Sequence, residues 1–242
     1  MKKSLCILIL YVLTISVQAQ MQNNFEFHYT YQIPSKEIKK RFGNNSSIGA
    51  SYIIKNQKNI LYGMEFNYLF SDNVKDTLIF ENITTEEGGL LDANGSFANF
   101  ILLQRGFDIY ILSGYAFLKD KKNLSGLYVT GGLGFIQHKI FIDTKNQNLP
   151  QLNEEYKKGY DRMTNGFSSK LSIDYKYYSK KEFFQFTTGI SLVTAFTKIR
   201  RPYLIDQKTF SSKELGIDQL FGIKAGFIIP INRSNKEEFY YY

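Results

Sequence analysis

Three side chains of this sequence could together perform nucleophilic catalysis: Asp108, His138 and Ser168. A serine becomes a nucleophile when a histidine accepts its proton and a carboxylate orients that histidine, and such a set is recognised by geometry rather than by order in the chain. If the turn centred near residue 122 pairs the segments on either side, Asp108 lies close to His138. If the 143–164 connection is even, His138 lies opposite Ser168. This register predicts an acid, base and nucleophile at one rim of a sheet, where a lipid or peptide substrate could arrive.

The sequence does not indicate a metal or cofactor site. Its two histidines, His28 and His138, are far apart and lack the close spacing of paired metal ligands. The glycine-rich stretch GGLG (131–134) falls inside a predicted strand, where glycine permits curvature and bulky neighbours. The one cysteine, Cys6, lies in a predicted signal peptide, so the exported chain has no disulfide framework. We therefore expect no cofactor and no metal.

Segments with a two-residue apolar repeat must position these side chains. In NFEFHYTYQIP (24–34), phenylalanine, tyrosine and isoleucine alternate with glutamate, histidine, threonine and glutamine, which is typical of a strand with one apolar and one polar face. Seven further segments repeat this pattern. The eight predicted strands are residues 24–33, 47–55, 59–70, 106–118, 126–142, 165–178, 183–198 and 216–231.

The connections between these strands alternate in length. Residues 56–58, 119–125 and 179–182 are short, whereas 34–46, 71–105, 143–164 and 199–215 are long. Short turns at one end and long loops at the other are typical of outer-membrane barrels with both termini in the periplasm. The sequence therefore predicts an all-β, single-domain, antiparallel transmembrane β-barrel with eight strands. The longest loop contains LIF (78–80) and FANFILL (97–103), which leaves open a hairpin extension or a ten-strand barrel.

Composition agrees with an exported membrane barrel. The 242 residues include 18 tyrosines and 21 phenylalanines but no tryptophan, and such an aromatic content suits the girdles of a barrel. After the N-terminal segment, the sequence has no apolar run of about 18 residues, so we expect no transmembrane helix. The net charge of +8 is attributed to lysines in turns and loops at an anionic membrane surface, and we expect no nucleic-acid partner.

The sequence divides into three parts. Residues 1–19 are a predicted cleaved signal peptide, because two lysines precede an apolar stretch and Val17-Gln18-Ala19 fits a cleavage site. An uncleaved anchor is the alternative. Residues 20–231 form the predicted barrel. Residues 232–242 form a predicted periplasmic tail that ends in Phe239, Tyr240, Tyr241 and Tyr242.

The polar face of the strands carries many charges. An eight-stranded barrel is just wide enough to be filled by its own side chains, and buried charges need partners. We therefore expect a closed lumen. Its predicted charge network consists of Glu26, His28, Glu65, Asp108, Lys170, Asp174, Lys176 and Lys224.

The last strand contains KAGFIIPI (224–231), which resembles the C-terminal assembly signal of small outer-membrane β-barrel proteins of the OmpX/PorT-like type, a family of the Bacteroidota style. The matching residues are Lys224, Gly226, Ile229 and Ile231. The resemblance covers the whole chain in pattern but only these eight residues in motif, and the tail after the signal departs from the family. It implies the outer membrane of a Gram-negative bacterium, insertion by barrel-assembly machinery, and a role in secretion or envelope assembly.

Three functions fit this sequence. The first, which we expect, is a non-enzymatic accessory barrel with a closed lumen that binds an envelope protein, outer-membrane lipid or lipopolysaccharide. Its predicted contacts are Arg200 and Arg201, since arginine binds phosphate bidentately, and the aromatic tail Phe239 to Tyr242. The second is a small outer-membrane enzyme that uses Asp108, His138 and Ser168. The third is a narrow channel or small-molecule binder.

Overall fold

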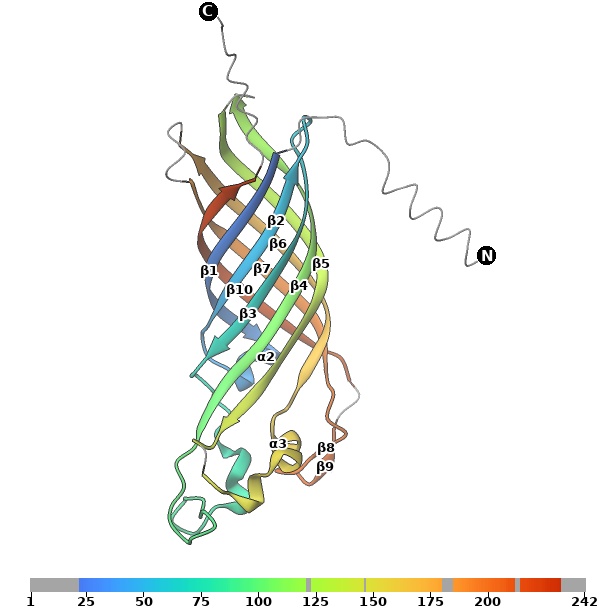
Figure 1. The fold of residues 1–242 in the computed structure, drawn as a ribbon. Coiled ribbons are helices and arrows are strands. Elements are labelled where there is room, and N and C mark those ends of the chain that lie inside the picture. The colour runs from blue at the N-terminus through green and yellow to red at the C-terminus, as the bar shows by residue number, and fades with distance from the viewer. Residues whose placement is uncertain (1–21, 121–122, 146, 180–184, 212–213, 232–242) are drawn as a thin grey trace, which may run out of the picture.

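Eight antiparallel strands close into a barrel (Figure 1), which confirms the predicted fold class. The computed structural model describes residues 22–120, 123–145, 147–179, 185–211 and 214–231. The predicted signal peptide (1–19) and tail (232–242) lie outside the described residues. The barrel strands are β1 (Gln22–Lys36), β2 (Asn45–Lys55), β3 (Ile60–Ser71), β4 (Ile101–Asp120), β5 (Asn123–Asp143), β6 (Thr164–Tyr178), β7 (Gln185–Ile199) and β10 (Gly216–Pro230).

The first and last strands close the ring. β1 pairs with β10 from Asn24 opposite Pro230 to Lys36 opposite Asp218, so the KAGFIIPI segment forms part of the closing strand. In a hydrocarbon environment every backbone amide must find a partner within the protein, and a closed sheet meets that demand. The order around the ring is β1-β10-β7-β6-β5-β4-β3-β2, which places β5 opposite β1 and β6 opposite β2.

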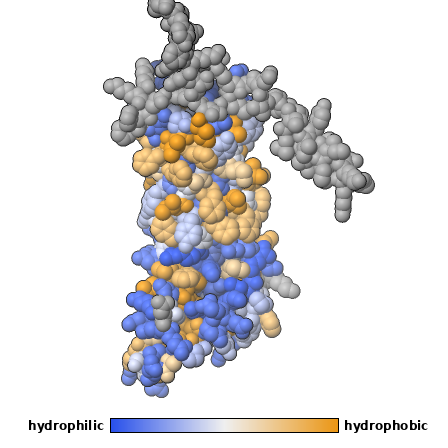
Figure 2. Space-filling model, in the orientation of Figure 1, coloured by the Kyte–Doolittle hydropathy of each residue, from blue (hydrophilic) through white to orange (hydrophobic). Residues whose placement is uncertain are grey.

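Large apolar side chains cover the outside of the barrel. The alternation of each strand sends one residue outward and the next into the lumen, and on β1 the exposed outward residues run from Phe25 to Ile33. Figure 2 shows these hydrophobic residues gathered on the wall, with a hydrophilic surface over the long-loop end. The barrel is therefore apolar outside and polar inside, the reverse of a soluble protein.

The helices lie in the connections. No helix among the described residues is long and apolar enough to cross a membrane.

The long loops fold into a compact cap at the end opposite Gln22 and Ile231 (Figure 1). It contains α2 (Glu37–Arg41), the 3-10 helices η1 (Leu78–Ile83) and η2 (Pro150–Leu152), α3 (Glu154–Tyr160), and a small hairpin of β8 (Tyr203–Leu204) and β9 (Thr209–Phe210). Ile79 and Phe80 are buried in it, and Phe80 packs edge-on against Phe100 and Tyr160. The cap thus has an apolar core of its own.

The ten-strand alternative is wrong, because eight strands close the ring. In the longest loop, Leu91 and Phe97 form an isolated antiparallel bridge rather than two further barrel strands. The LIF segment belongs to η1, because its apolar side chains pack into the cap rather than against lipid. Ile101 to Leu103 begin β4 and pair with Phe141 to Asp143 of β5. β4 and β5 therefore continue past the barrel rim as a two-stranded extension that the sequence patterns did not reveal.

The closing seam should be sensitive to side-chain volume at Gly226. A Cβ added there would meet the backbone oxygen of Phe27 and the side chain of His28 across the seam. We expect Gly226→Val to destabilise the barrel by about 1–3 kcal/mol, the usual cost of overpacking. Ala225→Val, at the exposed neighbouring position, should change stability by less than about 0.5 kcal/mol. Urea unfolding in lipid vesicles measures both, and equal stabilities would contradict this account of the seam.

Candidate functional site

Three buried ion pairs cross the lumen. Lys176 of β6 donates to Glu26 of β1, and Lys170 of β6 donates to Glu65 of β3. A third pair joins Lys224 Nζ of β10 to Asp174 Oδ2 of β6 at 2.9 Å. All six side chains are buried, and each pair joins strands that are not neighbours in the ring. The lumen is thus bridged by charges that neutralise one another.

An amide links the remaining predicted lumen residues to these pairs. His28 Nε2 donates to Asn67 Oδ1 at 2.8 Å, and Asn67 Nδ2 donates to Glu65 Oε1 at 2.8 Å and to Asp108 Oδ1. All eight residues predicted for the lumen network are therefore buried inside the barrel. Asn67 was not among them, although its inward position on β3 is visible in the alternating pattern.

Aromatic rings fill the space between the charges. Tyr110 is fully buried, shares a hydrogen bond of 2.8 Å with Ser168, and lies under the Lys170 ammonium. Lys176 Nζ lies 4.7 Å from the ring centroid of Tyr128. On β5, Gly134 leaves room for the Tyr110 ring, because a Cβ at that position would lie 2.8 Å from Tyr110 Cδ1. These contacts leave the lumen packed with side chains.

The structure does not bring Asp108, His138 and Ser168 together. Pairing about residue 122 is as predicted and puts Ile136 opposite Asp108, but His138 lies opposite Thr164 rather than Ser168. The predicted β5–β6 register is wrong by four residues, because β5 continues past His138 to Asp143 and pairs there with β4 but not with β6. Ser168 contacts Tyr110, Asp108 contacts Asn67, and His138 Nε2 donates to Asp218 Oδ2 at 3.0 Å.

The His138–Asp218 pair lies beneath a plug at the cap end of the lumen. α2 follows β1, and Phe42 comes directly after α2. The Phe42 ring packs edge-on against His138 of β5, the strand opposite β1 in the barrel, with ring centroids 5.7 Å apart. Arg41 donates to Thr164 Oγ1 of β6. Phe42, Ile38 and His138 have no exposed surface. α2 thus closes the mouth, a role that its short polar sequence did not indicate.

Ion pairs hold the loops of the cap together. Arg162 Nε lies 2.7 Å from Asp76 Oδ2, and Arg162 Nη2 lies 2.6 Å from Asp206 Oδ2, so one guanidinium joins three loops. Arg201 binds Asp161 through two nitrogens, and this hydrogen bonding raises the pKa of Arg201 above its usual range. The neighbouring Arg200 is exposed and donates to Asn165. The loops of the cap therefore form one folded unit that is held together by ion pairs.

Several large apolar side chains of the cap face outward. Leu78 is 72% exposed, Phe97 56% and Phe210 81%. They lie on three different parts of the cap: η1, the loop before β4, and β9. Exposed apolar side chains of this size on a folded surface are candidates for contact with a partner.

Solved structures with a similar strand arrangement include three bacterial proteins. Neisserial surface protein A has a TM-score of 0.47 and 10% identity, over 86% of this chain and 96% of that chain. Ail, the attachment invasion locus protein of Yersinia pestis, has a TM-score of 0.43 and 9% identity, over 86% and 98%. The N-terminal β-barrel domain of Pseudomonas aeruginosa OprF has a TM-score of 0.39 and 11% identity, over 87% and 100%. No protein-family model and no curated protein matches the sequence.

The lumen pairs predict an asymmetry between single and double substitutions. Glu26→Gln leaves Lys176 buried without a counter-charge, which should cost about 3–5 kcal/mol of unfolding free energy. Glu26→Gln combined with Lys176→Met removes both charges and should recover most of that loss. Glu154→Gln, at the exposed Glu154–Lys157 pair of α3, should have almost no effect. Urea unfolding of the four proteins in vesicles measures these values, and an unchanged Glu26→Gln barrel would show that the pair is not sequestered from water.

Proposed function

We propose that this chain is an integral outer-membrane β-barrel of a Gram-negative bacterium with a sealed lumen, and that its folded cap binds a partner in the cell envelope. The reversed polarity of the barrel supports the membrane assignment. The observation that carries the binding role is the filled lumen beneath a folded cap. A barrel with a filled lumen does not conduct ions, but its cap can still bind a partner.

The ends of the barrel support an orientation. The described residues nearest the termini, Gln22 and Ile231, lie at the short-turn end. In outer-membrane barrels short turns face the periplasm and long loops face outward. The cap is then extracellular, and the termini are periplasmic. Ile229 and Ile231 are about half exposed on the outer wall, where barrel-assembly machinery could contact them during insertion.

The channel alternative is disfavoured by what occupies the lumen. Ion pairs cross it at three places, tyrosine rings fill the gaps, and α2 covers the mouth. An eight-stranded barrel leaves little interior space beyond its own side chains. An ion would have to break a buried salt bridge to pass.

The enzyme alternative is disfavoured by the separation of its three residues. His138 donates to Asp218, is covered by Phe42 and has no exposed surface, so Ser168 does not adjoin it and a substrate from outside does not reach it. Ser168 is fully buried against Tyr110. A general base must lie within hydrogen-bond reach of the proton it removes, and His138 does not lie so to Ser168.

The side chains exposed on the cap indicate what kind of partner it would bind. The exposed residues Leu78, Phe97 and Phe210 favour a protein that buries apolar side chains, and the resemblance to the OmpX/PorT-like type would make it part of secretion or envelope-assembly machinery. Arg200 is exposed at the base of the cap and is a proposed contact for lipopolysaccharide phosphate. The tail residues Phe239 to Tyr242 are proposed as a second, periplasmic contact.

Photo-crosslinking in intact cells tests the cap as the binding surface. A benzophenone amino acid replaces Phe210 in one variant and Phe227, an outward residue of the barrel wall that is 72% exposed, in a matched control. We expect a crosslinked band of defined mass from Phe210 and only lipid adducts from Phe227. Variants at Leu78 and Phe97 extend the test across the cap. If correctly folded protein gives no protein crosslink from any of the three cap positions, the binding role is wrong.

A further inference from the structure

A polar groove lies on the outside of the barrel, where the wall of β1 to β4 meets the cap. Its volume is about 510 Å³, and small-molecule sites occupy about 300–1,000 Å³. Tyr31 of β1, Ser46 of β2, Phe70 of β3 and Arg105 of β4 line it and lie opposite one another on successive strands. The sheet register therefore sets these four side chains in one row on the outer face. We call this feature the wall groove.

Hydrogen bonds fix the cap side of the wall groove. Ser71 Oγ donates to the Asn44 backbone oxygen at 2.8 Å and accepts from the Asn73 backbone nitrogen at 3.0 Å. The Gly43 backbone nitrogen donates to the Asn73 oxygen at 2.8 Å, and a Cβ at Gly43 would lie 2.2 Å from Asn73 Nδ2. Asn44 Nδ2 donates to Tyr31 Oη at 2.8 Å. The segments that follow α2 and β3 are thus clasped together, and they hold both asparagines at the groove.

The wall groove carries one cation and one carboxylate. Arg105 uses one of its five N–H donors in a bond of 2.8 Å to the Gln104 backbone oxygen, and Asp72 is exposed directly after β3. Neither side chain forms an ion pair with a side chain that the structure describes. Lys139, opposite Arg105 on β5, does not line the groove. The formal charges of its lining residues cancel, which favours a ligand without net charge.

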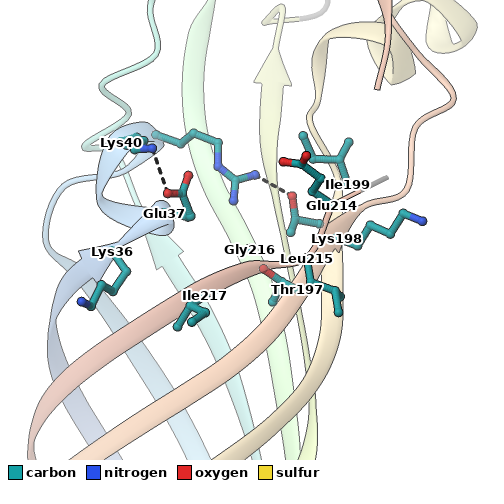
Figure 3. A pocket seen from close by; sticks show the side chains of 12 residues that line it. Lys36, Glu37, Lys40, Thr197, Lys198, Ile199, Glu214, Leu215, Gly216 and Ile217 are labelled. Atoms are coloured by element: carbon teal, nitrogen blue, oxygen red, sulfur yellow. Dashed lines mark hydrogen bonds and ion pairs between the residues drawn. The ribbon is translucent and has the colours of Figure 1, made fainter. Parts of the chain in front are cut away.

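The larger groove between α2 and the rim ends of β7 and β10 differs in this respect (Figure 3). Two carboxylates, Glu37 and Glu214, line it together with its cations. Lys40 Nζ lies 2.8 Å from Glu37 Oε1, and the side chains of Lys36 and Lys198 point away from each other. Its charged groups do not converge on one ligand.

The groups of the wall groove match the two aspects of a sugar ring. Sugar hydroxyls both donate and accept hydrogen bonds, and the groove offers guanidinium donors, carboxylate acceptors and asparagine amides that do both. The C–H face of a sugar packs well on an aromatic ring, and Phe70 lies in the same row as Arg105. Phe70 stacks on Tyr68, which is exposed one step further down the wall, with ring centroids 6.3 Å apart. Aromatic surface therefore runs from the groove into the apolar wall.

We propose that the wall groove binds the sugar headgroup of an outer-leaflet glycolipid. Arg105, Asp72 and Asn73 form hydrogen bonds with its hydroxyls, Phe70 packs against the sugar ring, and an acyl chain lies along Tyr68. The inference rests on the proposed function in one respect, namely that the cap end of the barrel faces the outer leaflet. An anionic headgroup would meet the Asp72 carboxylate, and a lipid without a polar headgroup would leave the polar side chains of the groove uncovered.

Lipid retention by the purified full-length protein tests this site. The protein, in micelles of a detergent that carries no sugar, is titrated with glucosyldiacylglycerol. Parallel titrations use phosphatidylethanolamine and diacylglycerol with the same acyl chains, and native mass spectrometry counts the bound lipid. We expect the glucosyl lipid to bind about tenfold more tightly than either of the others, since its hydroxyls alone pair with both charged side chains.

Matched variants assign the retention to the groove. The test variant carries Asp72→Ala and Arg105→Gln. The control carries Glu86→Ala and Lys208→Gln, which remove the same two charges from exposed positions of the cap. We expect the test variant to bind glucosyldiacylglycerol about tenfold more weakly and the control to bind it like the unaltered protein. Phe70→Leu, which keeps an apolar side chain but removes the ring, should weaken binding several-fold.

Three results would overturn the proposal. Equal retention of the three lipids by the unaltered protein would show that the groove does not recognise a sugar. A preference for phosphatidylethanolamine would assign the groove to a zwitterionic headgroup instead. Equal weakening in the test and control variants would place the bound lipid elsewhere. Unfolding midpoints show whether the variants are folded, and the comparison of lipids needs no variant. Crosslinking from Phe210 is independent of all three results, so this site can fail while the binding role of the cap stands.

Discussion

Three lysines enclosed by this barrel each need a carboxylate from another strand, and the rest of the structure depends on that requirement. Lys176 reaches Glu26, Lys170 reaches Glu65, and Lys224 reaches Asp174 across the lumen. A slip of one residue in any strand would turn its charges toward the apolar exterior and leave their partners unpaired. The pairs therefore contribute to a single register as well as to a filled interior.

A filled interior moves the functional surfaces to the ends of the molecule. α2 covers the mouth, and ion pairs centred on Arg162 tie three loops into a cap. The cap presents Phe210 and other apolar side chains outward. The chain thus separates the apolar wall of the barrel from a tip that carries both ion pairs and exposed apolar side chains.

The sequence predicted the features that depend on local alternation. Eight strands, their inward and outward faces and the interior charges follow from a two-residue repeat, which needs no knowledge of distant contacts. The β5–β6 register could not be predicted, because it depends on the β4–β5 extension beyond the rim. The plug by Phe42 and the His138–Asp218 pair join residues far apart in the chain. One local signal was available and missed: Asn153, which accepts hydrogen bonds from Glu155 and Tyr156 at the start of α3, is a favoured N-cap residue.

The central claim is that the lumen is sealed, and single-channel recording in planar bilayers tests it most directly. The full-length protein, refolded and shown to be folded by its unfolding transition, is inserted into a bilayer and recorded over a wide voltage range at high salt. We expect no unitary conductance steps from inserted protein, because three buried ion pairs and the tyrosine rings beside them occupy the lumen. Reproducible ohmic steps from the folded barrel would contradict it and would make conduction, rather than display, the function to pursue.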